Sequence, residues 1–161
     1  MSLTIASLPV GGGLLALCPM PGRGGTYEAD LRAVLAFGPA LVLSMTTRAE
    51  MAAKGAAGLG EGLAGHGIAW RHLPVADFGV PGGDVAALWP GVAAEARAVL
   101  AGGGRVLVHC MGGCGRSGMA LLRLMVGAGE DPQAALQRLR SVRPCAVETE
   151  AQFAWAAGGE P

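Results

Sequence analysis

A cysteine and an arginine lie six positions apart near the middle of the chain, within the segment RVLVHCMGGCGRSG (residues 105–118). An apolar run precedes this cysteine, Cys110, and a glycine-rich loop follows it. If a strand ends at Cys110 and a helix begins at Ser117, the backbone N–H groups of the loop point inward at the positive end of the helix dipole. Such a loop suits a tetrahedral anion such as phosphate, with the guanidinium of Arg116 on two oxygens and the Cys110 sulfur facing the central atom. The chemistry indicated is nucleophilic attack by a thiolate.

The residues that follow Cys110 favour a catalytic cysteine over a structural one. A helix N-terminus and an adjacent arginine both stabilise the thiolate form. A buried cysteine at a strand end is common, but that alternative does not account for Arg116 and Ser117 at fixed offsets. Ser117 caps the predicted helix or donates its hydroxyl to the sulfur when Cys110 leaves an intermediate, and both roles can coexist. The predicted phosphate-binding residues are Met111, Gly112, Gly113, Cys114, Gly115 and Arg116.

Transfer of a phosphoryl group from an ester also requires a proton for the departing oxygen, and the chain has four aspartates. Asp30 lies in a predicted helix, and Asp84 and Asp131 precede predicted helices. Asp77 instead lies in a loop rich in glycine and proline after a predicted strand, so we predict that Asp77 is the general acid and not a turn residue. The triplet DFG that begins there also matches a kinase metal-binding motif, but the chain is too short for a kinase and lacks the other kinase signatures.

Apolar runs of strand length alternate with helical patterns along the chain. Strands are predicted at residues 14–17, 40–45, 68–73 and 105–109. Helices are predicted at 27–37, from a cap at Thr46 or Thr47 to 54, at 59–66, 84–100 and 117–126, from 132 onward, and at 149–157. Asp84 is the predicted cap of the long helix, with Pro90 bending it or delaying its start, and Asp131 caps the helix that begins at Pro132. The alternation predicts an α/β fold, with a central, mostly parallel sheet and helices on both faces. Residues 1–161 are predicted to form a single domain.

Charge and hydropathy exclude several classes of partner. The 161 residues carry 12 basic and 12 acidic side chains, so no basic stripe points to nucleic acid. No apolar run approaches the roughly 18 residues of a membrane span, so no membrane partner is predicted. The N-terminal segment has no positive region ahead of its apolar residues, which predicts a protein without a signal peptide and a cytoplasmic location.

Four cysteines are too few and too scattered for a disulfide framework, so reduced thiols are expected. Cys110 and Cys114 lack the spacing and the second pair of ligands that a zinc site requires, and no metal or cofactor is predicted. Cys114 is predicted to be a small residue that packs within the loop. On oxidation of Cys110, a disulfide is expected to form with Cys18 in preference to Cys114.

The segment HCMGGCGRS resembles the signature loop of the cysteine-dependent phosphatases, in their dual-specificity branch. Other stretches are similar to the kinase-associated phosphatase-like group of that branch. They are the acid loop at residues 74–77 followed by Pro81, the stretch 47–50 near the second strand, the turn at Pro21-Gly22, and the segment 147–152 that positions the hydrolytic water. The resemblance covers most of the chain and implies the cysteine-phosphatase fold.

The resemblance also implies a role for each matching residue. Cys110 forms a phosphocysteine, Arg116 binds the phosphate, and Asp77 acts first as acid and then as base. Gln152 or Glu148 orients the hydrolytic water, although Glu148 stands where many relatives have glutamine. His109 supports the loop through hydrogen bonds.

The predicted function is metal-independent hydrolysis of phosphomonoesters, either on phosphoprotein at Tyr and Ser/Thr or on a small substrate. Tyrosine-specific members have an aromatic recognition loop and Trp-Pro-Asp on the acid loop, whereas here Val75-Ala76 precede the aspartate. The signature loop has no lysine, which disfavours phosphoinositides. Two alternatives are a rhodanese-like sulfur transferase, against which Asp77 and the loop spacing argue, and a phosphate-binding pseudoenzyme, which commonly lacks the cysteine, arginine or acid present here. Arg23 either reaches substrate from its glycine-rich turn or is a solvated loop residue.

Overall fold

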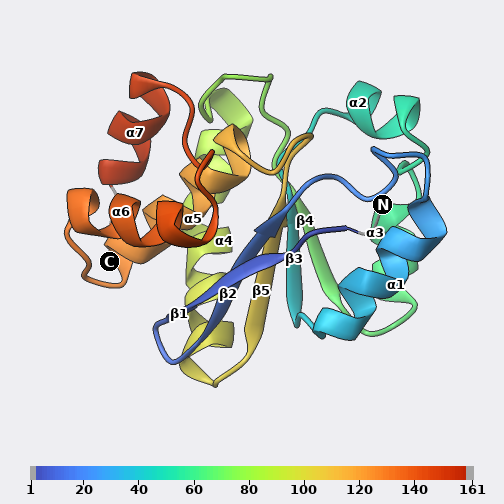
Figure 1. Cartoon of the computed structure of the whole chain (residues 1–161), viewed down its shortest axis with the longest axis horizontal. Coiled ribbons are helices and arrows are strands. Elements are labelled where there is room, and N and C mark those ends of the chain that lie inside the picture. The colour runs from blue at the N-terminus through green and yellow to red at the C-terminus, as the bar shows by residue number, and fades with distance from the viewer. Residues whose placement is uncertain (1–2, 159–161) are drawn as a thin grey trace.

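Five strands form one sheet in the computed structural model, which describes residues 3–158. The strands are β1 (Ala6–Val10), β2 (Gly13–Cys18), β3 (Leu41–Ser44), β4 (Ala69–His72) and β5 (Arg105–His109). The helices are α1 (Tyr27–Phe37), α2 (Arg48–Ala53), α3 (Leu59–Ala64), α4 (Gly83–Ala101), α5 (Gly115–Gly127), α6 (Pro132–Val142) and α7 (Glu150–Ala157). The strand order is β1-β2-β5-β3-β4, with helices on both sides of the sheet (Figure 1). The predicted fold class is confirmed.

β1 is the one antiparallel strand of the described sheet, and it was not predicted. It pairs with β2 through a hairpin at Gly11 and Gly12, whose φ angles are 60° and 102°. A two-residue hairpin turn of this kind requires positive φ at both positions, which glycine adopts at little cost. Pro9 is tolerated because β1 lies at the sheet edge, where a missing N–H breaks no central ladder. The other neighbouring strands pair in parallel.

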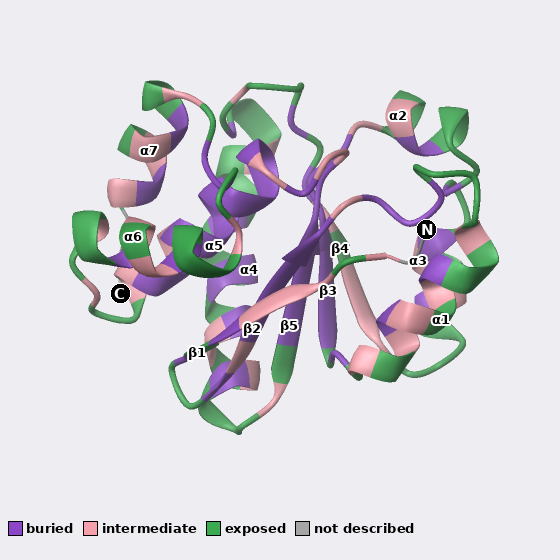
Figure 2. Cartoon of the chain, viewed as in Figure 1, coloured by how far each residue is buried: buried purple, intermediate pink, exposed green. Residues whose placement is uncertain are grey.

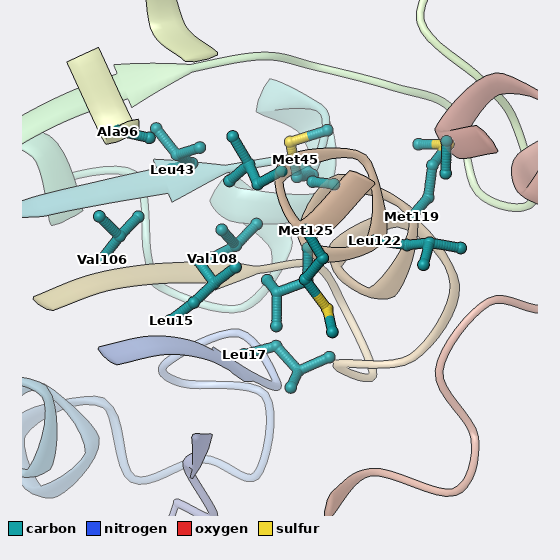
Figure 3. Close-up of a cluster of buried hydrophobic side chains, with 14 of the residues drawn as sticks. Leu15, Leu17, Leu43, Met45, Ala96, Val106, Val108, Met119, Leu122 and Met125 are labelled. Atoms are coloured by element: carbon teal, nitrogen blue, oxygen red, sulfur yellow. The ribbon is translucent and has the colours of Figure 1, made fainter. Parts of the chain in front are cut away.

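The core lies in two layers, because alternate residues of the central strands point to opposite faces of the sheet. On one face, Leu15 and Leu17 of β2 and Val106 and Val108 of β5 pack with residues of α4 and α5 (Figure 3). On the other face, Ala16, Cys18, Val42 and Leu107 pack against α1, α2 and α3. Figure 2 shows the central strands buried between the two groups of helices. This burial makes the carboxyl ends of β2, β3 and β5 a rigid edge for the loops that follow them.

Capping groups define several helix ends. The Thr47 side chain accepts from the Glu50 N–H at the start of α2, and Asp131 caps α6 as predicted. Asp84 does not cap α4, because that helix begins at Gly83 with Gly82 in the cap position, and Pro90 lies inside it without ending it. Among residues 3–158, none of the helices combines the length and the apolar character that crossing a bilayer requires.

Candidate active site

Cys110 lies where the signature loop leaves the end of β5. Its side chain is almost completely buried, with 2% of the residue exposed, and it lines a hollow of about 340 Å³. The loop is held against the end of β2, because the Met111 carbonyl accepts from the Met20 N–H at 3.1 Å. Gly113 has a φ of 72°, and a Cβ there would lie 2.6 Å from the Cys18 carbonyl carbon. The glycine at this position therefore permits both the curl of the loop and its close approach to β2.

Ser117 contacts the nucleophilic sulfur and does not cap the helix. α5 begins at Gly115, two residues earlier than predicted, and Cys114 occupies its cap position. This start places Ser117 inside the first turn, with its Oγ 3.1 Å from the Cys110 Sγ. A hydroxyl at this distance can donate to a thiolate. Of the two predicted roles, the structure shows the contact with sulfur.

Arg116 is fully buried, and its guanidinium is oriented by a carboxylate. Nη1 and Nη2 donate to the two carboxylate oxygens of Glu50 at 2.7 and 2.9 Å, and Nη1 also donates to the Val75 carbonyl at 2.8 Å. Nε is buried and has no hydrogen-bond partner among the described residues. An unpaired buried donor costs free energy. The edge of Arg116 that carries Nε is therefore suited to an anion in the loop.

Glu50 is a site residue to which the sequence assigned no role. The hydrogen bonds from Arg116 are the largest cause that lowers the pKa of Glu50 from 4.5 to about 2, against the opposing effect of burial. The same carboxylate accepts from the Thr47 N–H at 2.9 Å. One side chain thus caps α2 and binds the arginine of a loop 66 residues away. The sequence signal was the Thr47–Glu50 spacing of a capping box.

Asp77 lies at the rim of the same hollow, and its role as the general acid stays a prediction. Its side chain is 57% exposed, with Oδ1 3.4 Å from Arg116 Nη2. Phe78 follows with a φ of 62°, and its N–H donates to Asp77 Oδ1 at 3.0 Å. A non-glycine residue in this conformation is strained and needs support from its surroundings. Gln152 Nε2 provides support by donating to the Gly79 carbonyl at 3.2 Å.

Gln152 joins the acid loop to the start of α7. Its side-chain carbonyl accepts from the Glu148 and Thr149 N–H groups at 2.9 and 3.3 Å, and the residue is fully buried. A Cβ on Gly115 would lie 3.1 Å from Gln152 Nε2 and would collide with Glu148 Oε1. Gln152 and Glu148 therefore lie against the signature loop, although they follow it by more than thirty residues. Their role in orienting water stays a prediction.

His109 anchors the loop from beneath in a single tautomer. Nδ1 lies 3.2 Å from the Cys110 carbonyl oxygen, which only accepts, so Nδ1 carries the proton. Nε2 then accepts from the Ser44 hydroxyl at 2.6 Å, and that hydroxyl in turn accepts from Trp70 Nε1 at 2.8 Å. Burial lowers the pKa of His109 from 6.5 to about 4, so the ring is neutral near pH 7. The predicted supporting contact to the loop is present.

The expectation of four reduced cysteines is wrong. Cys114 and Cys145 form a disulfide, with their Cα atoms 5.1 Å apart, while Cys18 and Cys110 are free. The pairing arises because the segment between α6 and α7 folds over the signature loop, where the Val147 N–H donates to the Cys114 carbonyl at 3.1 Å. The spacing of the cysteines along the sequence does not reveal a contact between two residues that lie 31 positions apart. Cys114 therefore ties the loop to a neighbouring segment and is not merely a small packing residue.

The described residues 3–158 hold no group of three His, Cys, Asp or Glu side chains arranged to bind a metal ion. Cys18 is fully buried, and burial is the largest cause that raises the pKa of its thiol far above the usual value. A thiol in this state is a poor nucleophile. Of the two free cysteines, Cys110 is the one that lines the hollow.

Comparison with known families shows which family the chain belongs to. A model of the family described as cyclin-dependent kinase inhibitor 3 (CDKN3) matches residues 11–136. The chain is 30% identical over 146 residues to cyclin-dependent kinase inhibitor 3 of Mus musculus, covering 86% of this chain and 68% of that one. The chain belongs to this family. The corresponding protein of Rattus norvegicus is 30% identical over 147 residues, with the same shares covered. The resemblance inferred from the signature loop is confirmed.

Solved structures share the fold of this CDKN3 family member. A kinase associated phosphatase (KAP) whose catalytic cysteine is replaced by serine matches with a TM-score of 0.84 and 24% identity, over 97% of this chain and 93% of that one. Tk-PTP in its active form matches with a TM-score of 0.74 and 26% identity, over 96% of each chain. The CDKN3 family member is a cysteine-dependent protein phosphatase of the dual-specificity fold, as predicted. The sulfur-transferase and pseudoenzyme alternatives are not favoured.

Proposed function

We propose that this phosphatase removes phosphate from Ser, Thr and Tyr side chains of phosphoproteins, with Cys110 as nucleophile. One observation carries the proposal: the free Cys110 thiol, the unpaired Nε of Arg116 and the Asp77 carboxyl converge at one site. A thiol and an exposed acid at one hollow, with an arginine 3.4 Å from that acid, are the groups that transfer through a phosphocysteine requires.

In the first step, the loop N–H groups and Arg116 bind the phosphoryl oxygens. The Cys110 thiolate attacks phosphorus, an S–P bond forms, and the ester P–O bond breaks. The departing oxygen takes a proton from Asp77, whose exposed carboxyl lies at the rim of the hollow that Cys110 lines. Glu50 keeps the guanidinium in place during this step, so no side-chain reorganisation is needed when charge develops on the phosphoryl group.

In the second step, water attacks the phosphocysteine and gives its proton to Asp77. The S–P bond breaks, and the Ser117 hydroxyl, 3.1 Å from the sulfur, donates to the thiolate as it departs. Glu148 lines the hollow, and Gln152 lies next to it against the loop. We assign both to the orientation of the attacking water, with Glu148 as the exposed member and Gln152 as the residue that also supports the acid loop.

The rim of the site supports broad specificity. Val75 and Ala76 precede the acid, and Phe78 is the aromatic residue among those lining the hollow, with 58% of its surface exposed. A single exposed ring can pack on a phosphotyrosine ring without closing the site to shorter phosphoserine or phosphothreonine side chains. The names of the family and of the KAP relative both refer to kinases, so a phosphorylated kinase is the first protein substrate to test. We propose a cytoplasmic location with this function.

A panel of substrates tests the proposal. The purified protein is assayed with an aryl phosphate, with phosphopeptides that differ only in pSer, pThr or pTyr, and with a phosphoinositide, each in excess chelator and with or without vanadate. We expect hydrolysis of the aryl phosphate and of all three peptides, inhibition by vanadate, and little hydrolysis of the lipid. Hydrolysis of the lipid alone, or activity that requires a divalent ion, contradicts the proposal.

A further inference from the structure

Two arginines that the mechanism does not use lie beside the signature loop. Arg23 follows β2 in the turn before α1, and Arg143 lies between α6 and α7. Both line the hollow that contains Cys110, and both also line an adjoining hollow of about 460 Å³. The two cavities therefore share these two arginines in their walls.

Arg143 is fixed in place by the loop itself. Its Nε donates to the Gly113 carbonyl and its Nη2 to the Gly112 carbonyl, each at 2.9 Å. These bonds leave the Nη1 group of the fork for another acceptor. Cys145 follows Arg143 by two positions, and its disulfide with Cys114 holds the same segment against the loop. Arg143 is thus a preorganised positive charge.

Arg23 lies close to the same part of the loop. A Cβ on Gly112 would lie 3.7 Å from Arg23 Nη1, so the guanidinium extends over the glycine whose carbonyl Arg143 binds. Arg23 is exposed, and no hydrogen bond or ion pair joins its side chain to another residue within 3–158. Two like charges that approach one another without a shared counterion repel. An anion between them removes that repulsion.

The acidic groups nearby do not supply this anion. Asp30 lines the adjoining hollow, but it is buried and accepts from the Gly22 N–H at 2.9 Å and the Thr26 hydroxyl at 3.3 Å. Asp77 and Glu148 line the hollow of Cys110, and neither forms an ion pair with Arg23 or Arg143 within the described part of the chain. Within residues 3–158, the acidic residues that line the two hollows therefore leave the charge of Arg23 and Arg143 without an ion-pair partner.

We propose that Arg23 and Arg143 form a second anion subsite, which binds an acidic side chain, either a carboxylate or a second phosphate, next to the phosphorylated residue of a peptide substrate. The subsite deepens the proposed function and rests on it. Neighbouring residues of a peptide are about 3.8 Å apart along the chain, so a peptide with its phosphate on the loop can place a flanking side chain over Gly112. The apolar walls of the adjoining hollow, Leu3, Pro19 and Met20, suit a peptide better than a polyphosphorylated inositol, whose groups are all polar.

Matched phosphopeptides test the subsite. Each peptide carries one phosphorylated target residue, and the residue directly before or after that target is Glu, Gln, Lys or a second phosphorylated residue, phosphoserine. The measured quantity is the ratio of kcat/KM for the acidic peptide to kcat/KM for its Gln counterpart, determined within each enzyme. We expect a ratio of about fivefold for the wild type at low salt, which falls as ionic strength rises. Arg23→Ala should bring the ratio close to one, and Arg23→Glu should shift the preference to the Lys peptide.

Arg32→Ala is the matched control, because Arg32 is an exposed arginine of α1 that lines neither hollow. It should keep the wild-type ratio. A wild-type ratio of one, or a ratio that Arg23→Ala leaves unchanged, overturns the subsite while the proposed function stands. A preference for inositol polyphosphates that depends on Arg23, without an effect on peptides, overturns it in favour of a lipid headgroup. If the aryl phosphate is hydrolysed but no phosphopeptide is, the proposed function fails, and the subsite fails with it.

Discussion

Glu50 holds the guanidinium of Arg116 through both of its carboxylate oxygens, at 2.7 and 2.9 Å, and leaves the buried Nε without a hydrogen-bond partner among the described residues. The pair joins the start of α2 to the start of α5, and the arginine is 1% exposed while the glutamate is 22% exposed. A charge as buried as that of Arg116 requires a partner in the fold whether or not a substrate is bound. Glu50 therefore contributes both to stability and to the geometry of phosphate binding.

Replacing Glu50 by Gln should weaken both properties. The variant keeps the shape of the side chain but removes the charge opposite Arg116, so we expect the free energy of unfolding to fall by about 3 kcal/mol and kcat/KM to fall by about tenfold or more. Urea unfolding and aryl phosphate hydrolysis measure the two effects. Glu95→Gln is the matched control, because it breaks the exposed Arg71–Glu95 pair and should change stability by less than about 1 kcal/mol. Equal effects of both substitutions contradict the role of Glu50.

The stabilisation from Glu50 should depend on pH in a defined direction. Its pKa is lowered from 4.5 to about 2 in the folded protein, so the contribution is fully present above 4.5 and is lost as the pH falls toward 2. The difference in unfolding free energy between the wild type and Glu50→Gln should be constant near neutrality and shrink through this window. Denaturant titrations at several pH values measure it, and a difference that does not vary below 4.5 counts against the ion pair.

Asp77→Asn should affect substrates according to their leaving groups. Alkyl phosphates of Ser and Thr need a proton on the departing oxygen, whereas an activated aryl phosphate barely does. We expect a loss of about a hundredfold or more in kcat/KM on the phosphoserine peptide, a smaller loss on the aryl phosphate, and a flattened basic limb of the pH profile. Equal losses on both substrates would move the acid role to Glu148 or Glu150, of which Glu148 already lines the hollow.

Cys145→Ser tests the tie between the signature loop and the α6–α7 segment. The disulfide joins positions 31 residues apart, and a loop of this length contributes about 4 kcal/mol. The wild type should therefore lose stability when reduced, whereas Cys145→Ser should be less stable from the start and insensitive to reductant. Thermal unfolding with and without a thiol measures this difference. A wild type that does not respond to reduction would show that the pair is not joined in solution.

Oxidation by peroxide should inactivate the enzyme without forming a second disulfide. Cys114 is already paired with Cys145, and burial keeps Cys18 in its thiol form, so neither thiolate is available to trap a sulfenic acid on Cys110. This prediction differs from the expectation based on sequence, which favoured Cys18 as the disulfide partner of Cys110. Peptide mapping should show Cys110 oxidised further, and phosphate should protect it. A Cys110–Cys18 crosslink would contradict this prediction.

The parts of the site that the sequence predicted are those determined by neighbouring residues. Apolar content and flanking glycines defined β5 at residues 105–109, and the loop offsets placed Cys110, Arg116 and Ser117 in one cradle. The unpredicted parts depend on contacts between distant residues. The Glu50–Arg116 pair spans 66 positions, and the disulfide spans 31. Such contacts arise only when the parallel sheet brings its loops to one edge. The spacing of apolar residues along the sequence, which predicts helices and strands, carries no information about them.

The central claim is that turnover proceeds through a phosphocysteine at Cys110. Rapid acid quench of the enzyme with a phosphopeptide, followed by mass spectrometry of the peptide that contains Cys110, tests it most directly. We predict one phosphate on Cys110 during turnover. The phosphocysteine should accumulate further in Ser117→Ala, because the sulfur loses the hydroxyl donor that lies 3.1 Å away. Cys110→Ser should show neither the phosphate nor turnover. Turnover by Cys110→Ser above the uncatalysed rate, or wild-type turnover without phosphate on Cys110, would contradict the account.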